Sequence, residues 1–262
     1  MNHTPMAHLT DAEPYIVLAV IFALVTYLWV AIATNHRGQL RRWPLYRYGC
    51  WFIGLGCAAT AVVGPLANRA HTDFAAHMTG HLLLGMLAPI LLVFAAPMTL
   101  LLRTLRVADA RRLSRLLHRY PLRFISHPIV AAALNIGGLW LLYTSELYMA
   151  MQHNVWLHLI IHFHLFSAGY LFTASMIYID PVAHRFSFPY RAAVFVIALA
   201  GHGILTKYIY AFPPVGVARS DAELGAMLMY YGGDGIEVIL IIVLCLHWYK
   251  ATRPPRPTVR PI

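Results

Sequence analysis

Seven long apolar segments, separated by short polar or basic loops, limit what this chain can fold into more than any other feature of its sequence. A helix needs about 20 apolar residues to cross the hydrocarbon core of a bilayer, because each residue adds only about 1.5 Å. Charged residues make up 11% of the chain, compared with about 25% in soluble domains. The sequence therefore predicts an all-α integral membrane protein, a seven-transmembrane helical bundle. The predicted spans are residues 14–34, 49–67, 74–102, 128–147, 155–178, 189–212 and 225–249.

Basic residues lie almost entirely on one side of this predicted bundle. Of the 20 Lys and Arg residues, all except Arg69, Lys207 and Arg219 fall in or beside the loops after the first, third and fifth spans or in the C-terminal tail. Cytoplasmic loops carry such an excess, so we expect an extracytoplasmic N-terminal tail over residues 1–13 and a cytoplasmic basic tail over residues 250–262. The net charge of +10 is then explained by the membrane and its lipids, and we expect no nucleic-acid partner.

Two pairs of histidines fall in the half of the predicted bundle that faces outward. His77 and His81 lie four residues apart in the third predicted span, so on a helix they share one face. His158 and His162 repeat the same spacing in the fifth predicted span. Burying ionisable groups in a bilayer is costly unless they pair, line water or bind a metal. We therefore interpret the two pairs as parts of a functional site.

Three further ionisable residues fall at a similar depth, namely His202 in the sixth predicted span and Asp234 and Glu237 in the seventh. Imidazole suits copper, zinc, iron and nickel, and carboxylates can orient imidazole ligands. Asp234, Glu237 and Met78 are expected to orient the ligands or to tune the charge around them, and thioethers nearby favour cuprous copper. The predicted metal ligands are His77, His81, His158, His162 and His202.

The same polar residues also permit interpretations without a metal. A single intramembrane histidine more often forms a hydrogen bond between helices than it binds a metal. Asp234 and Glu237 could form a proton relay instead of orienting ligands. Tyr143 and Tyr148 belong to a larger group of aromatic residues that we interpret mostly as a belt at the membrane interface.

Three motifs, which occur in order along the chain, resemble a known family. They are HMTGHLLLGMLAPILLVFAAPMTLLLR, HLIIHFHLFSAGYLF and YYGGDGIE. Together they are similar to the polytopic CtaG family of cytochrome c oxidase assembly factors of the Bacillus type, and the resemblance covers essentially all seven predicted spans. It implies a multi-pass protein of the bacterial plasma membrane that is needed to form an active haem–copper oxidase and that has a role in supplying copper. The family's two histidine motifs fall on the two histidine pairs, and its acidic motif falls on Asp234 and Glu237.

The residues and the resemblance together predict a copper-binding assembly factor, a metallochaperone rather than an enzyme. It would receive copper from a donor protein on the outer side and help load a copper centre of a cytochrome c oxidase subunit. One alternative is a membrane redox enzyme that binds haem or a di-metal centre through the same histidines, because facing imidazoles can ligate haem. A copper transporter and an assembly scaffold that binds no metal are also compatible with these residues.

Overall fold

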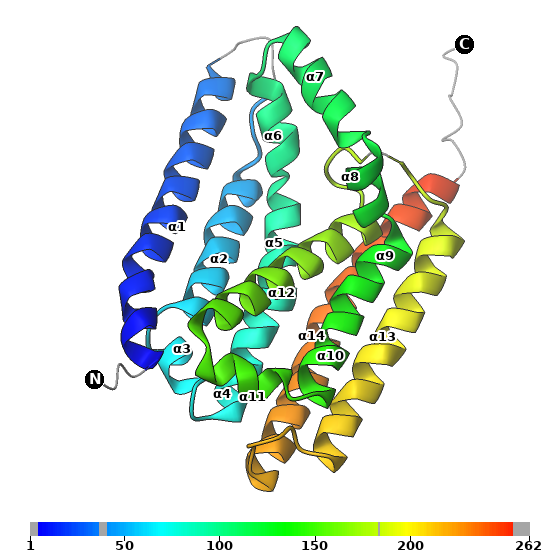
Figure 1. Ribbon diagram of the computed structural model, residues 1–262. Helices are drawn as coiled ribbons and strands as arrows, with labels where there is room; N and C mark the ends of the chain where they lie inside the picture. The colour runs from blue at the N-terminus through cyan, green and yellow to red at the C-terminus, as the bar shows by residue number, and fades with distance from the viewer. Residues whose placement is uncertain (1–4, 37–40, 183, 254–262) are drawn as a thin grey trace, which may run out of the picture.

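The computed structural model describes residues 5–36, 41–182 and 184–253, with side chains from residue 13 onward. Regular structure in these residues is helical throughout, and the long helices pack into one bundle (Figure 1). Most of the two predicted tails, residues 1–13 and 250–262, lies outside the described side chains.

Within the described residues, six helical segments are long and apolar enough to cross a membrane, and the chain is a multi-pass membrane protein. A seventh is present if the bent pair formed by residues 128–144 and 147–153 counts as one span. The six segments are α1 (Pro5–Asn35), α2 (Leu45–Val62) with α3 (Pro65–Arg69), the run from α4 (Phe74–His81) through η1 (Leu82–Leu87) and α5 (Ala88–Ala95) to α6 (Pro97–Thr104), α12 (Val155–Met176), α13 (Phe188–Ala211) and α14 (Arg219–Thr252).

The fourth predicted span is the bent one. It consists of α9 (Pro128–Ala132), the π-helical turn η2 (Ala133–Gly137) and α10 (Gly138–Thr144), after which the chain turns by 79° into α11 (Leu147–His153). Ser145 has an extended backbone at this turn, and its hydroxyl oxygen accepts a hydrogen bond from the Leu147 N–H at 3.2 Å. This bond satisfies one of the free N–H groups at the start of α11. Figure 1 shows α11 lying crosswise over one end of the bundle.

The third predicted span is interrupted near its far end. Ala96 adopts a left-handed conformation with φ of 51°, and Pro97 begins α6 directly after it. A proline disfavours helical backbone at the residue before it, so the helix stops at α5 and restarts. The Asp180 carboxylate, in the loop after α12, caps the restarted helix: it accepts hydrogen bonds from the N–H groups of Met98 and Thr99 at 3.1 and 2.7 Å and from the Thr99 hydroxyl at 2.5 Å.

Replacing Asp180 with alanine is therefore expected to destabilise the protein by about 2 kcal/mol, because partly buried N–H groups at the start of α6 lose their acceptor. Asp109→Ala is the matched control, since this first-turn acid of α7 (Val107–Leu117) forms only an exposed pair with Arg112 and surface pairs contribute about 1 kcal/mol or less. Thermal unfolding in detergent, followed by circular dichroism, measures both variants. Equal unfolding midpoints for the two would contradict the role of Asp180.

Helix α12 packs unusually close to η1 at two glycines. A side chain on Gly169 would overlap the backbone carbonyl of Gly85, and it would also touch Pro89. Lipid tails are as apolar as leucine, so membrane helices associate through such close packing and not through the hydrophobic effect. This contact brings α12 against the helical run that carries His77 and His81.

The helix α7 that follows α6 carries much of the basic sequence between the third and fourth predicted spans, and α8 (Tyr120–Ile125) leads from it into α9. In Figure 1, α7, α8 and the C-terminal end of α14 lie at one end of the bundle, whereas α3, α4 and α11 lie at the other. The two ends therefore differ in charge, and the candidate site residues lie toward the end without the basic helix.

Candidate functional site

Helix α4 positions the first two predicted ligands. The Asp73 carboxylate accepts hydrogen bonds from the N–H groups of Ala75 and Ala76 at 2.8 and 3.1 Å, which caps α4 at its N-terminus. His77 and His81 follow one turn apart and are only 6% and 2% exposed. Both imidazoles therefore lie inside the bundle.

Four imidazoles gather where the loop before α4 meets the first turns of α12, and we call His71, His77, His158 and His162 the outer cluster. The ring centres of His158 and His162 lie 4.0 Å apart in a stacked arrangement. The His71 ring centre lies 5.1 Å from that of His158, and the His77 ring centre lies 6.5 Å from that of His162. One loop and two helices thus contribute to a continuous group of rings.

Hydrogen bonds indicate which nitrogen of these rings keeps a lone pair. Nδ1 of His162 lies 2.9 Å from the backbone carbonyl of His158 and must donate to it, so Nε2 of the neutral ring is free to bind a metal. Nδ1 of His71 lies 3.3 Å from Oε1 of Gln152, whose amide nitrogen donates to the Tyr148 hydroxyl at 3.0 Å. Nδ1 of His158 is buried without a hydrogen-bond partner among the described residues. Backbone and amide oxygens commonly orient metal-binding imidazoles in this way.

Two tyrosines enclose His77. The Tyr143 hydroxyl shares a 3.1 Å hydrogen bond with Nε2 of His77, and the Tyr148 ring centre lies 5.0 Å from that of His77. Tyr143 and Tyr148 are 2% and 6% exposed. The interpretation of these two residues as part of an interfacial belt is therefore wrong, because they pack inside the bundle against the site.

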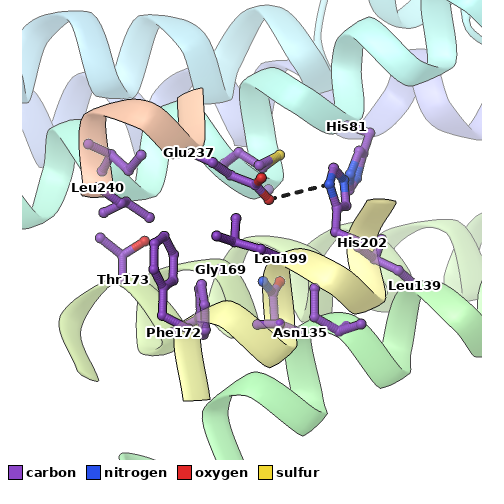
Figure 2. Close-up of a pocket in the computed structure, with 16 residues that line it drawn as sticks. His81, Asn135, Leu139, Gly169, Phe172, Thr173, Leu199, His202, Glu237 and Leu240 are labelled. Carbon is purple, nitrogen blue, oxygen red and sulfur yellow. Dashed lines mark ion pairs between the residues drawn. The ribbon is translucent and has the colours of Figure 1, made fainter. Parts of the chain in front are cut away.

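A second group consists of His81, His202 and Glu237, which we call the inner triad. Nδ1 of His202 lies 3.3 Å from Oε1 of Glu237, and both side chains are buried. The ring centres of His81 and His202 lie 6.5 Å apart with an angle of 29° between their planes. Figure 2 shows the Glu237 carboxylate directed at the His202 ring, with His81 beside that ring.

A small cavity of about 30 Å³ adjoins the inner triad. Met86 of η1, Asn135 of η2 and Thr173 of α12 also line it. A cavity of this size holds one water molecule or one small ion. In the part of the chain that the structure describes, neither ring nitrogen of His81 has a hydrogen-bond partner, and Nε2 of His202 has none either. The cavity is therefore bordered by buried nitrogens that no described residue satisfies.

Comparison with known families assigns the chain to one of them. Residues 25–251 match the family described as cytochrome c oxidase caa3 assembly factor (Caa3_CtaG). The chain belongs to this family. The match covers every segment that contributes to the outer cluster and the inner triad. The predicted resemblance to the CtaG family is therefore confirmed.

Similar proteins occur in mycobacteria. Uncharacterized proteins of Mycobacterium bovis and Mycobacterium tuberculosis are each 33% identical over 244 residues, which is 84% of this chain and 36% of theirs. An uncharacterized protein of Mycobacterium leprae is 26% identical over 231 residues, which is 79% of this chain and 35% of its own. This caa3 assembly factor family member thus spans about a third of the length of these relatives. No solved structure matches the chain.

The structure divides the predicted ligands of this family member between two places. His77 joins His158 and His162 in the outer cluster, whereas His81 turns to His202 in the inner triad. Glu237 lies against His202, a predicted ligand. Asp234 is exposed and lines a groove between α13 and α14 together with Lys207.

Met78, predicted to act beside the ligands, lies instead in the apolar core. It is fully buried and packs against α14 at Gly225. The methionine that borders the inner cavity is Met86, two turns further along the chain. His164, which follows the second histidine pair, is exposed, and its ring bonds the Leu134 carbonyl at 3.1 Å.

The arrangement limits which metal the site suits. Across residues 5–36, 41–182 and 184–253, no three His, Cys, Asp or Glu side chains are grouped so that they could hold one ion. The candidate donors are instead pairs of imidazoles and a thioether. Structural zinc almost always takes four ligands, whereas cuprous copper accepts two or three and favours imidazole and thioether. Pairs of imidazoles with a thioether are donors that copper accepts.

Several residues of the site carry no signal in the sequence. His71 lies in a loop, Gln152 lies in a short helix after a sharp turn, and Tyr143 lies in a span rich in aromatic residues. His71 reaches His158 from the loop before α4, and Tyr143 reaches His77 from α10. Gln152 reaches His71 because α11 folds back over the end of the bundle. The single usable signal is Asn135, a polar residue within an apolar segment, which lines the inner cavity.

Proposed function

We propose that this protein binds copper in the outer half of its helical bundle and helps load a copper centre of a cytochrome c oxidase subunit. The observation that carries the proposal is that three predicted ligands, His81, His158 and His202, have buried imidazole nitrogens without a hydrogen-bond partner among the described residues. Each buried polar group without a partner costs about 1–3 kcal/mol. Bound copper lowers this cost, because one nitrogen of each ring becomes a ligand.

The proposal includes an orientation in the bacterial plasma membrane. The bundle spans the membrane seven times, with α9 to α11 counted as one span, and has its N-terminus outside and its C-terminus in the cytoplasm. The basic helix α7 and the end of α14 lie at one end of the bundle (Figure 1), which supports placing that end in the cytoplasm. The outer cluster then faces the side from which a copper donor protein delivers its metal.

The residues have distinct roles in this proposal. His77, His81, His158, His162 and His202 hold the copper. Glu237 orients His202 through Nδ1, and the Tyr143 hydroxyl orients His77. The oxidase subunit receives the metal, and membrane lipids surround the exposed apolar faces of α1, α13 and α14.

The packing supports this role over haem binding and over transport. A haem cofactor needs a pocket of several hundred Å³, so the cavity of about 30 Å³ beside the inner triad argues against haem at that place. A transporter needs polar residues that continue toward the cytoplasm. The segment beyond the inner triad is instead a buried apolar cluster that includes Ile90, Val93, Phe172, Phe195 and Leu240.

The test is metal analysis, with an optical spectrum, of the protein purified without an affinity tag from cells supplied with copper. We expect at least one copper per chain and no haem absorption, and we expect His158→Ala to lower the copper content. The control is His118→Ala, whose exposed ring bonds the Ser114 carbonyl in the basic helix. A Soret band, or a copper content that His158→Ala leaves unchanged, would overturn the proposal.

A further inference from the structure

The two groups of imidazoles lie at separate places in the bundle. The Tyr143 ring lies near both groups, with its ring centre 6.0 Å from that of His77 and 6.5 Å from that of His81. Its hydroxyl bonds His77, so it belongs to the wall of the outer cluster. The outer cluster draws its rings from α4, α12 and the loop before α4, whereas the inner triad draws its members from α4, α13 and α14. Only α4 contributes to both.

The inner triad and Met86 offer a complete set of donors for one ion. Two imidazoles that bind one ion through facing nitrogens, each about 2 Å from it, have ring centres roughly 6 Å apart. The His81 and His202 rings are 6.5 Å apart, and three of their four nitrogens have no hydrogen-bond partner in the described chain. The fourth, Nδ1 of His202, faces Glu237. The Met86 side chain lines the same cavity and brings a thioether.

The charge of this cavity favours one oxidation state of a bound copper ion. Glu237 is the one acid among the described residues that line it, and the remaining lining is mostly apolar. In its ionised form the Glu237 carboxylate would balance one positive charge. A monovalent ion would then leave the cavity neutral, whereas a divalent ion would leave an uncompensated charge in a low-dielectric site. Imidazole and thioether together also favour cuprous over cupric copper.

We infer that the inner triad with Met86 is a second copper station, specific for cuprous copper and distinct from the outer cluster. This inference rests on the proposed function, because copper reaches the inner station from the outer one. In that step the ion exchanges a nitrogen ligand of His77 for one of His81, one turn deeper on α4. The ion keeps its charge, one copper–nitrogen bond breaks as another forms, and no electron is transferred.

The experiment titrates the full-length, untagged protein in detergent with cuprous copper, supplied anaerobically as its bicinchoninate complex. X-ray absorption at the copper edge then reports whether sulfur is bound. We expect two copper ions per chain and a copper–sulfur signal. Met86→Leu should remove the sulfur signal and lower the affinity for one of the two ions by about tenfold, while the affinity for the second ion is unchanged. Met229→Leu is the control, since this methionine is fully buried in the apolar core.

Two further variants separate the stations. His202→Gln should lower the binding to one ion, without sulfur. His158→Ala with His162→Ala should also lower it to one ion, and that ion should keep its sulfur ligand. If the wild type bound a single copper ion and all of these variants abolished its binding, the inference of two stations would be overturned. The proposed function would remain. A sulfur signal that persists in Met86→Leu would also overturn the inner station, and a wild type that binds no copper would overturn both proposals.

Discussion

We expect a strain that carries His158→Ala together with His162→Ala to assemble a cytochrome c oxidase that lacks copper, with oxidase activity about tenfold or more below the wild type. The two rings are stacked at 4.0 Å in the first turns of α12. In the proposed function, removing both takes away two of the copper ligands. Replacing even a residue that merely orients a metal ligand weakens metal binding about 10–100-fold, so the loss of two ligands has at least that effect.

The measurement is the ratio of copper to haem in the isolated oxidase, together with oxygen consumption by the membranes. His164→Ala is the matched control on the same helix, because its exposed ring bonds the Leu134 carbonyl and faces away from the outer cluster. We expect this variant to match the wild type. An oxidase with its full copper content in the double variant would show that these imidazoles do not supply the metal.

Gly169→Ala is the second change with a large expected effect. The added methyl group would overlap the carbonyl of Gly85, and a backbone carbonyl cannot move aside without separating α12 from η1. Overpacking of this kind costs about 1–3 kcal/mol, and backbone displacement places this case at the upper end. Because the contact holds α12 against the run that carries His77 and His81, the variant should also lose copper.

Thermal unfolding in detergent measures the loss of stability, and metal analysis measures the loss of copper. Gly56→Ala on α2 serves as the control, since a methyl group there meets nothing within 4 Å, and we expect its stability to stay within about 0.5 kcal/mol of the wild type. If Gly169→Ala unfolded at the wild-type temperature, the close contact of the two helices would not be what holds the site together.

Much of the helical architecture could be predicted because apolar length is a property of the chain itself. The helices of the described residues follow the predicted spans, and the interruption before Pro97 follows from the local chemistry of proline. The turn at Ser145 could not be predicted, since it depends on one hydroxyl that bonds the next helix. That turn sends α11 across the bundle and brings Tyr148 and Gln152 to the outer cluster.

The sequence by itself determined that this is a multi-pass helical membrane protein and that its imidazoles gather toward one end, because apolar runs and residue spacing are local properties. It did not determine which imidazoles lie in the outer cluster and which in the inner triad. His77 and His81 share a helix face, yet they differ by about 40° around the helix and about 6 Å along it. Only the tertiary structure decided that the first meets α12 and the second meets α13 and α14. The physical reason is that contacts between helices fix how each helix is turned, as the close packing of Gly85 and Gly169 does for η1 and α12, and such contacts join residues far apart in the chain.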